Sequence, residues 1–201
     1  MSDESLTPLE SLAITLYEIG AVQFGKFKLH SGKKSRIYLD MRVLASYPEA
    51  LREVAGAYRT VLEGLDYDVV AATPLAGLPI GTAIALDMNQ PLIYPRKTAK
   101  SYGTGKAIEG VYGIGDTAVV VDDLVTSGDS IVQTIAALKA GGLRVTDAVV
   151  LIDREQGGAE NLRSGGYRLH SIMSLPYLLD VLLEQGHISE KKFHRTLKSI
   201  R

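Results

Sequence analysis

The sequence contains no cysteine, which excludes a disulfide framework, a zinc–thiolate centre and a thiol nucleophile. A chain without cysteine also suits the reducing cytoplasm, where we expect this protein to be located. An excess of charge of one sign is missing as well, because 22 Lys and Arg residues oppose 23 Asp and Glu residues and leave a net charge of −1. Overall charge therefore gives no reason to expect a nucleic-acid or membrane partner, and any anion site must be local.

Long hydrophobic runs are also absent. Residues 148–152 form one of the longest apolar runs, which is far shorter than the roughly 20 residues that span a bilayer. Hydrophobic residues nevertheless make up 46% of the 201 residues, enough for one sizeable core. Because we find neither an internal repeat nor a linker, we expect a single domain over residues 1–201.

The first part of the sequence predicts two helices with a hairpin between them. Apolar residues recur at helical spacing over residues 8–20, and again from residue 48 to about residue 64. Between these helices, residues 22–41 carry apolar positions on both sides of a Ser31-Gly32 turn. This pattern favours a hairpin that stands apart from the main sheet.

From residue 68 onward the pattern alternates between strands and helices, which predicts an α/β fold with a central parallel sheet flanked by helices. In such sheets ligands bind beyond the carboxyl ends of the strands. We therefore expect the chemistry in the loops that begin at Thr73, Pro95, Asp122 and Asp153. Short β-branched runs lie at residues 69–70, 92–94, 118–121 and 148–152, and helical stretches lie near residues 78–88 and 128–140.

The phosphate loop, which we define as residues 126–130, gives the strongest functional signal. It follows a predicted buried strand that ends in the acidic pair Asp122 and Asp123, and it leads into the first turn of a helix. Backbone N–H groups at a helix N-terminus bind anions, and the hydroxyl groups of the loop can add hydrogen bonds. Two carboxylates suit the vicinal hydroxyls of a sugar or a divalent cation shared with it. The combination predicts a ribose 5-phosphate site.

The same residue types also have a purely structural interpretation, in which the acidic pair ends a strand and residues 127–129 cap a helix. A cap would account for one carboxylate or hydroxyl, whereas residues 122–130 supply six. The functional interpretation therefore explains more of the segment.

A second signal is the basic loop, residues 96–110. Its four Lys and Arg residues against one Glu give it a charge of +3 in a chain whose total is −1. Gly103 and Gly105 disfavour a persistent helix, so we expect a mobile loop that closes over an anion. A diphosphate leaving group suits such a loop, because fixed cations stabilise charge that grows as a bond breaks. On this segment alone, a solvated surface loop explains the charges equally well.

These segments resemble those of a known family. The string from Thr117 to Ile131, with its acidic pair and Thr-Ser-Gly turn, resembles the signature of type I phosphoribosyltransferases, which bind 5-phosphoribosyl 1-diphosphate there. The Arg-Lys-x-x-Lys-x-Tyr-Gly-Thr stretch of the basic loop is similar to the catalytic loop of orotate phosphoribosyltransferases, and residues 24–40 look like the N-terminal segment of that family. The similarity runs from about residue 20 to residue 158.

The resemblance implies a parallel sheet with flanking helices and a small N-terminal hood, formed here mainly by residues 20–45. It also implies a homodimer that uses Mg²⁺ and transfers the phosphoribosyl group of 5-phosphoribosyl 1-diphosphate to orotate. The products are orotidine 5′-monophosphate and diphosphate, in a step of pyrimidine (UMP) synthesis. In such a dimer, the loop over residues 96–110 of one subunit reaches into the site of its partner.

The resemblance also assigns residues to the diphosphate and to catalysis. It implies that Lys97 of one subunit surrounds the diphosphate together with Arg96, Lys100 and Tyr102 of the other. Lys100 and the acidic pair, Asp122 and Asp123, are the expected catalytic residues, and Lys100→Ala is expected to lose the most turnover. Mg²⁺ is expected to be held mainly by 5-phosphoribosyl 1-diphosphate near the acidic pair, with no side chain assigned as a direct ligand.

The remaining assignments concern the ribose phosphate and the base. The Arg154 guanidinium is expected to bind the orotate carboxylate through two hydrogen bonds. A surface arginine is the alternative interpretation of this residue. Ile37, Tyr38 and Thr126 are expected to border the base. The expected contacts of the ribose 5-phosphate are Asp122, Asp123, Leu124, Val125, Thr126, Ser127, Gly128, Asp129 and Ser130.

Two positions depart from the family pattern. His30 stands where the family often has a lysine, and Ala76 lies in the loop where some members carry a tyrosine–lysine pair. Two alternatives therefore stay open: a phosphoribosyltransferase for another base, and a non-catalytic regulator of the same fold that senses 5-phosphoribosyl 1-diphosphate. Arg154 and residues 24–40 argue against the first alternative, and the intact basic loop argues against the second.

The end of the chain predicts an amphipathic helix, with Phe193 and Leu197 on its apolar face and Lys and Arg residues on the other. A nucleic-acid arm is the alternative for that basic face. His170, His187 and His194 share no metal-ligand spacing with carboxylates, so we interpret them as surface or structural residues.

Overall fold

The structure is a computed structural model that describes residues 6–28, 32, 34–96 and 107–200. The first half of the chain forms α1 (Pro8–Glu18), β1 (Val22–Lys28), β2 (Lys34–Leu39), the 3-10 helix η1 (Met41–Ser46), α2 (Pro48–Leu62), β3 (Val69–Ala72), α3 (Gly77–Met88) and β4 (Leu92–Pro95). The second half forms β5 (Ile108–Glu109), β6 (Thr117–Val125), α4 (Asp129–Ala140), β7 (Arg144–Asp153), α5 (Gly158–Ser164), β8 (Arg168–Ser174), α6 (Leu175–Glu184) and α7 (Glu190–Ile200).

A six-stranded sheet forms the centre of the molecule, with the strand order β5-β4-β3-β6-β7-β8. The strands β3, β4, β6, β7 and β8 run parallel, and the short β5 pairs antiparallel with β4 at one edge. The parallel direction places the carboxyl ends of β3, β4, β6 and β7 along one side of the sheet, where ligands of such folds bind. The predicted α/β fold with a central parallel sheet is confirmed.

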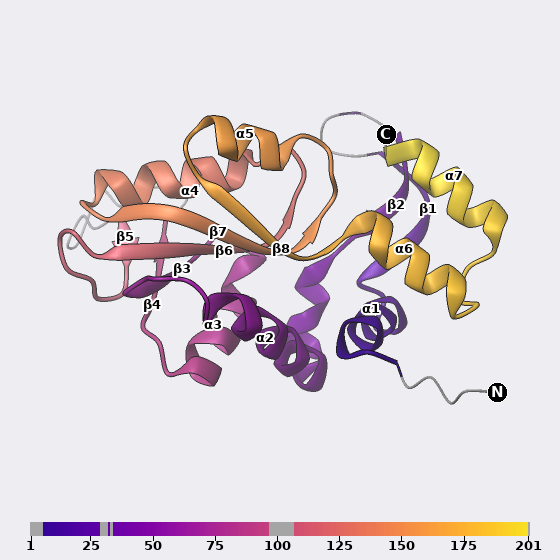
Figure 1. Cartoon of the computed structure of the whole chain (residues 1–201), viewed down its shortest axis with the longest axis horizontal. Coiled ribbons are helices and arrows are strands. Elements are labelled where there is room, and N and C mark those ends of the chain that lie inside the picture. Colours follow the sequence, from indigo (N-terminus) through magenta and orange to yellow (C-terminus); the bar gives the residue numbers. More distant parts are fainter. Residues whose placement is uncertain (1–5, 29–31, 33, 97–106, 201) are drawn as a thin grey trace.

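Helices cover both faces of this sheet (Figure 1): α4 and α5 lie on one face, and α2 and α3 lie on the other. Successive residues of β6 point into two separate cores. Val119 and Val121 are buried with residues of α1, α2, α3 and α6, whereas Ala118 and Val120 are buried with residues of α4 and α5. A strand covered on both faces needs apolar residues at every position, which explains why its sequence lacks polar alternation.

Local side-chain caps fix where two of the helices begin. At α1, Thr7 Oγ1 accepts a hydrogen bond from the Glu10 amide at 3.2 Å, and the Glu10 carboxylate accepts one from the Thr7 amide at 2.6 Å. This capping box pairs amides that a helix N-terminus otherwise leaves free. At α6, Ser174 Oγ accepts a hydrogen bond from the Tyr177 amide at 3.2 Å. No helix in the described ranges is both long enough and apolar enough to cross a membrane.

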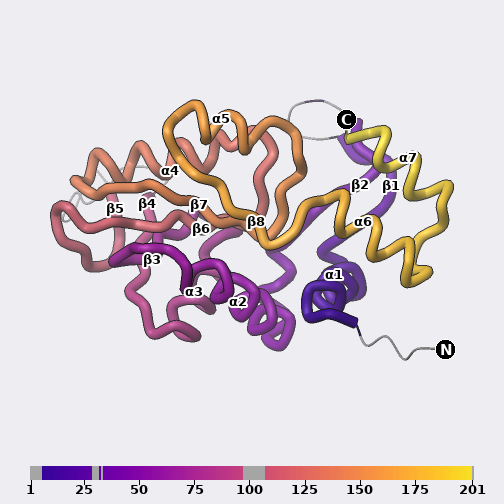
Figure 2. The backbone as a smooth tube through the Cα atoms, in the orientation of Figure 1, coloured from indigo at the N-terminus to yellow at the C-terminus, as the bar shows by residue number. Residues whose placement is uncertain are grey.

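The hood is the antiparallel hairpin of β1 and β2, which forms a two-stranded sheet of its own. The tube in Figure 2 shows α7, near the C-terminal end of the chain, lying beside this hairpin from the N-terminal part. The Arg36 amide of β2 donates a hydrogen bond to Ser199 Oγ of α7 at 3.4 Å. The prediction of a hairpin apart from the main sheet over residues 22–41 is confirmed.

Some predicted elements differ from the structure at their ends. The strand expected to end in the acidic pair continues through both aspartates to Val125, so that boundary is wrong. The cause is the neighbouring strand, because β7 extends to Asp153 and pairs with β6 as far as Val125. The sequence patterns also miss β5, which has only two residues, and β8, where Arg168 and His170 interrupt the apolar positions.

Candidate active site

The acidic pair lies in the last part of β6, at the carboxyl side of the sheet. Asp122 is only 4% exposed. Its carboxylate accepts hydrogen bonds from the Asp123 amide at 2.9 Å and from Ser130 Oγ at 3.2 Å. Because Ser130 belongs to the first turn of α4, this contact joins the acidic pair to the phosphate loop. The residues predicted to bind sugar and phosphate are therefore brought together in one place.

Burial raises the pKa of both carboxyl groups in the acidic pair. The pKa of Asp122 lies well above its ordinary value, because desolvation has the largest effect and the negative charge of Asp123 adds to it. At Asp123, hydrogen bonds and the positive charge of Arg42 act against the effect of burial. The pair therefore holds a proton more readily than two exposed aspartates, so it can donate as well as accept hydrogen bonds to the hydroxyl groups of a ligand.

The phosphate loop forms the turn from β6 into α4. Gly128 precedes the helix with a φ of 85°, a left-handed conformation that favours glycine. Within the described part of the chain, no group accepts a hydrogen bond from the backbone amides of residues 126–131. These amides stand at the positive end of the helix dipole, so the turn has the properties of an anion site.

Helix α5 packs against the phosphate loop and holds its backbone. Asn161 Nδ2 donates a hydrogen bond to the Ser127 carbonyl oxygen at 2.9 Å. A Cβ atom at Gly158 would lie 2.8 Å from the Thr126 carbonyl oxygen and 2.4 Å from Val125 Cγ2, closer than real Cβ contacts. Glycine at position 158 is therefore required for α5 to approach the loop this closely.

Tyr58 of α2 supports the acidic pair from the other face of the sheet. Its side chain is fully buried, and its hydroxyl donates a hydrogen bond to the Asp122 carbonyl oxygen at 2.6 Å. Burial, together with the negative charges of Asp123 and Asp122, raises the pKa of this hydroxyl well above its ordinary value, so it stays a donor. The bond fixes the backbone of the acidic pair from a helix 64 residues earlier in the chain.

Arg154 directly follows β7 and lies beside the phosphate loop, because its amide donates a hydrogen bond to the Val125 carbonyl oxygen at 3.1 Å. The residue is only 6% exposed, so it is not a surface arginine. Its Nε and Nη2 atoms are buried and have no hydrogen-bond partner among the residues that the structure describes. Burial lowers the pKa of the guanidinium. A buried cation without a partner is costly for the fold itself, so this side chain has the properties of a binding group for an anion.

A cavity of about 500 Å³ lies between the carboxyl ends of β3 and β4 and the first turns of α4. It adjoins the acidic pair, because Ser130 lines it. Thr73 and Pro74, from the loop after β3, form part of its wall. Arg96, which is predicted to contact the diphosphate, lines the same cavity and forms an ion pair with Glu109 of β5. Three of the four loops expected to carry chemistry therefore meet at this cavity.

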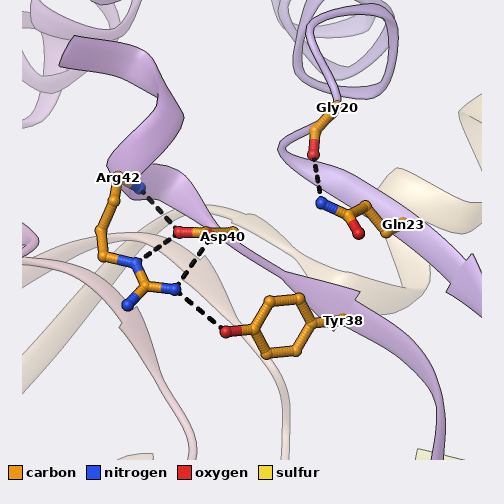
Figure 3. Close-up of polar contacts among 5 residues, drawn as sticks. All are labelled: Gly20, Gln23, Tyr38, Asp40 and Arg42. Atoms are coloured by element: carbon orange, nitrogen blue, oxygen red, sulfur yellow. Dashed lines mark hydrogen bonds and ion pairs between the residues drawn. The ribbon is translucent and has the colours of Figure 1, made fainter. Parts of the chain in front are cut away.

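The end of β2 and the start of η1 contribute a polar cluster of Tyr38, Asp40 and Arg42, drawn in Figure 3. The Arg42 guanidinium donates to both carboxylate oxygens of Asp40, at 2.6 and 2.8 Å, and its Nη2 atom also donates to the Tyr38 hydroxyl at 3.0 Å. These bonds hold the ring of Tyr38, which is expected to border the base. Ile37, with the same expected role, is fully buried and can offer only its backbone. Arg42 also acts on the pKa of Asp123, so the cluster lies within electrostatic reach of the acidic pair.

The carboxylates of the site fit a metal ion that is shared with a substrate, and they do not form a complete set of protein ligands. No cluster of three or more His, Asp or Glu side chains that could hold a metal ion occurs in the described residues. The acidic pair supplies two carboxylates, and Mg²⁺ at phosphate-transfer sites is commonly held by one or two carboxylates together with substrate phosphates. The residues present therefore fit a Mg²⁺ ion that arrives with a phosphorylated substrate, and they do not form a cage of protein ligands.

His170 takes part in a structural cluster between β7 and β8. Its Nε2 atom lies 2.7 Å from Asp147 Oδ1, and Arg168 donates two hydrogen bonds to the same carboxylate at 2.8 and 2.7 Å. The hydrogen bonding from Arg168 has the largest effect on the pKa of Asp147, and the contact with His170 adds to it. Together they hold this pKa well below its usual range. The cluster ties the edge strand β8 to the sheet and is separate from the acidic pair.

Several predicted residues lie outside the part of the chain that the structure describes. These are Lys97, Lys100 and Tyr102 of the basic loop, and His30 of the hood. The ends of the basic loop are described, at Arg96 and at residues 107–110. The expected roles of the other loop residues stay predictions.

Four residues that shape the site are not found by sequence reasoning: Tyr58, Asn161, Gly158 and Arg42. Tyr58 and Asn161 act across 64 and 34 residues of sequence, so no local pattern marks them. Gly158 and Arg42, by contrast, belong to short sequence patterns that could have drawn attention to them. Gly158 is the second residue of a Gly-Gly pair at the start of α5, and Arg42 completes an Asp-x-Arg sequence after β2.

Two longer proteins match this chain over part of their length. The chain is similar in structure to UMP synthase of Leishmania donovani, with a TM-score of 0.89 and 40% identity, over 95% of this chain and 42% of that chain. In sequence it is similar to uridine 5′-monophosphate synthase of Bos taurus, with 40% identity over 194 residues, 96% of this chain and 40% of that protein. The chain thus spans about two fifths of the length of these relatives.

A shorter relative matches over nearly its whole length. Orotate phosphoribosyltransferase of Pyrobaculum aerophilum is 39% identical over 183 residues, which are 90% of this chain and 94% of that protein. No family model matches the chain. The parallel sheet, the acidic pair that leads into a helix N-terminus and the hairpin hood define a type I phosphoribosyltransferase. Given the extent of the match to this relative, the chain belongs to the orotate phosphoribosyltransferase family.

Proposed function

We propose that this protein is an orotate phosphoribosyltransferase. It transfers the phosphoribosyl group of 5-phosphoribosyl 1-diphosphate to a ring nitrogen of orotate, giving orotidine 5′-monophosphate and diphosphate in UMP synthesis. The observation that carries the proposal is the buried guanidinium of Arg154, whose Nε and Nη2 atoms have no partner in the described structure and which lies next to an anion-binding turn. The names of the relatives point to the same reaction.

The unpartnered edge of Arg154 matches a carboxylate in its geometry. Nε and Nη2 form one edge of the planar guanidinium, which can donate two parallel hydrogen bonds. Elsewhere in this structure, Arg42 and Arg168 use these two atoms to bind the carboxylates of Asp40 and Asp147. Orotate carries a carboxylate, which would satisfy Arg154 in the same way.

The phosphate loop and the acidic pair bind the other substrate. The free amides of residues 126–131 take the 5-phosphate, and the carboxyl groups of Asp122 and Asp123 take the two ribose hydroxyls. Since Ser130 contacts both Asp122 and the cavity beside β3 and β4, the ribose would lie with its diphosphate directed into that cavity. Leu124 and Val125 belong to β6, where Val125 is buried and can contribute only its backbone, whereas Leu124 is half-buried.

The reaction needs positioning more than covalent chemistry from the protein. The orotate nitrogen loses its proton to solvent and supplies an electron pair to the ribose C1 atom, while the bond from C1 to the diphosphate oxygen breaks and its electrons leave with the diphosphate. Charge grows on the diphosphate and the sugar becomes cation-like, so fixed groups of opposite sign stabilise this stage. We assign the acidic pair to the sugar and Arg96, Lys97, Lys100 and Tyr102 to the diphosphate.

Mg²⁺ is the cofactor of the proposed reaction. The acidic pair would hold it together with the substrate, as the donor set of the site allows. When bound, the ion neutralises negative charge on the diphosphate and so supports its departure. Asp122 and Asp123 keep their own contacts to the ribose hydroxyls.

Three further assignments belong to this proposal. The protein acts as a homodimer in the cytoplasm, and the basic loop over residues 96–110 serves the site of the partner subunit. Residues 1–201 work as a single domain. Support for the single domain comes from one apolar core that contains residues of α1, of the hood and of α7, together with β3 and β6.

A panel of bases tests the proposed function. The purified protein is mixed with 5-phosphoribosyl 1-diphosphate, Mg²⁺ and one base at a time, and release of diphosphate is measured. We expect kcat/KM for orotate to exceed that for uracil, hypoxanthine and adenine by about 1,000-fold or more, because a buried cation rejects bases without a carboxylate. Faster release with another base would identify a different phosphoribosyltransferase. Binding of 5-phosphoribosyl 1-diphosphate without release for any base would identify a non-catalytic sensor.

A further inference from the structure

The hood and α7 together form a basic surface, which we call the hood–α7 surface. A cavity of about 540 Å³ lies between them, and its cationic lining residues are Lys26 and Arg36 of the hood and Lys191, Lys192 and Arg195 of α7. No acidic residue lines this cavity. It shares no lining residue with the cavity beside the phosphate loop, so it is a different site.

A second cavity, of about 560 Å³, continues the first one. It shares Lys26 and Arg36 with the first cavity and adds Lys28 and Lys34 of the hood hairpin, again without an acidic lining residue. Seven cations therefore line two adjoining cavities in a chain whose net charge is only −1. The hood–α7 surface is a local concentration of positive charge.

The cations of this surface have no counter-ions in the described part of the chain. None of the seven takes part in an ion pair there, although Arg42, Arg59 and Arg168 of the same structure each pair with a carboxylate. Like charges held near one another repel, and an anion that binds among them removes this repulsion. The surface therefore favours a ligand with several negative charges.

The two halves of the surface are held together by contacts of their own. The Arg36 amide bonds to Ser199 Oγ at 3.4 Å, across 163 residues of sequence. The Lys192 ammonium group lies over the Phe24 ring, 5.3 Å from its centroid. At the end of α7, the Ile200 carbonyl oxygen accepts a hydrogen bond from Gln156 Nε2 at 2.7 Å. The cations of the hood and of α7 are thus arranged before any ligand binds.

We propose that the hood–α7 surface binds a small polyphosphate anion, of the class that includes inorganic tripolyphosphate and nucleoside triphosphates. Two adjoining cavities of this size suit a small ligand, and cations on both sides match a chain of phosphate groups. Single-stranded nucleic acid is a poorer fit, since it binds through exposed aromatic faces. Here Lys192 lies over the ring of Phe24, and the ring of Phe27 packs against that of Tyr38. The proposal does not depend on the proposed enzymatic reaction.

The test is a titration of the isotopically labelled protein of residues 1–201, followed by backbone amide chemical shifts and by calorimetry. Tripolyphosphate, adenosine triphosphate and a single-stranded oligonucleotide are added in separate arms. The first two are expected to shift the amides of Gly25, Arg36 and Ser189, which line the first cavity. The phosphate loop is also an anion site, so its amides are followed separately. The Kd values of the first two arms show whether the phosphate chain alone is recognised.

Two double variants with the same change in net charge make the test specific. Lys191→Glu with Arg195→Glu, on the surface, is expected to weaken tripolyphosphate binding about tenfold or more. Lys139→Glu with Arg144→Glu, away from the surface, is expected to change the Kd by less than about twofold. The neutral pair Lys191→Gln with Arg195→Gln is expected to give an intermediate loss, and circular dichroism checks that each variant folds. Shifts confined to residues 126–131, equal losses in the two double variants, or tighter binding of the oligonucleotide would overturn the proposal.

Discussion

At the scale of single residues, the proposed recognition of the orotate carboxylate depends on Arg154, a buried guanidinium without a partner in the described structure. Arg154→Met removes a buried unpaired charge and keeps most of the side-chain length, so we expect the free energy of unfolding to stay level or to rise. We expect KM for orotate to rise about 100-fold, because two charge-assisted hydrogen bonds are lost. Steady-state kinetics and denaturant unfolding measure the two quantities.

A merely structural role for Arg154 predicts the opposite pair of results. The variant would then be clearly less stable, and its KM for orotate would stay near that of the wild type. Arg163→Met provides the control, because Arg163 is exposed on α5 and, among the described residues, pairs only with Glu160. It should change KM by less than about twofold.

Asp122 gives a prediction that depends on pH. Burial raises its pKa in the folded protein, so between the ordinary pKa of about 3.9 and the raised value the folded state binds more protons than the unfolded state. Stability therefore falls as the pH rises through this window, and the loss remains at higher pH. Asp122→Asn removes that loss. Its melting temperature should exceed that of the wild type by a few degrees at about pH 7.5 and match it near pH 4, while activity falls about tenfold or more.

Asp147 provides the matched control, because its pKa is shifted in the opposite direction to that of Asp122. Its hydrogen bonds with Arg168 and His170 hold its pKa below the usual range. Its charge therefore stabilises the fold above the ordinary pKa, and this stability is lost as the pH falls through the lower pKa of the folded state. Asp147→Asn should melt at a lower temperature than the wild type at about pH 7.5 and approach it in acid. A shift of both variants in the same direction at neutral pH would show that the sign given for Asp122 is wrong.

At the scale of elements, the distance between α5 and the phosphate loop is set by Gly158, because a Cβ atom there would collide with the Thr126 carbonyl oxygen. Gly158→Ala should lower the free energy of unfolding by about 1–3 kcal/mol and raise KM for 5-phosphoribosyl 1-diphosphate, since the loop must move. Gly56→Ala is the control. Position 56 lies inside α2 with nothing within 4 Å of an added Cβ, so alanine should stabilise the protein by about 0.5–1 kcal/mol. Equal KM values in both variants would contradict the role of α5.

The elements also show what can be predicted from the sequence. The amphipathic helices at both ends, the hood hairpin and the central strands follow from local periodicity. The extension of β6 through the acidic pair could not be predicted in this way, because it depends on pairing with β7. The position of α7 against the hood joins residues 163 apart, so the basic surface that they share has no sequence signal as a unit.

In the candidate site, too, the residues that are contiguous in sequence could be predicted, and those that meet only on folding could not. The acidic pair and the phosphate loop are contiguous, so their residue types and spacing suffice to find them. The burial of Arg154 and the bond from Tyr58 to Asp122 arise only when distant segments pack, and no local pattern contains them. Sequence reasoning thus finds the groups that bind phosphate more readily than the groups that fix their positions.

At the scale of the whole molecule, the proposed sharing of the basic loop between subunits predicts a gain of activity on mixing. Lys100→Ala and Arg154→Met should each be nearly inactive at low orotate. If the loop serves the partner's site, half of the randomly mixed dimers contain one intact site, so the mixture should recover about a quarter of wild-type activity. Activity of the mixture equal to the average of the two variants would show that each loop serves its own subunit.

The transfer of a phosphoribosyl group to orotate can be followed in one measurement, the absorbance of orotate. The purified wild-type protein is mixed with orotate, 5-phosphoribosyl 1-diphosphate and Mg²⁺, and Asp122→Asn is run beside it. We predict a steady fall in orotate absorbance with the wild type, matched by one diphosphate released for each orotate consumed. With the variant, we predict that the rate falls about tenfold or more. A folded wild-type protein that binds 5-phosphoribosyl 1-diphosphate and leaves the orotate absorbance unchanged would contradict the account.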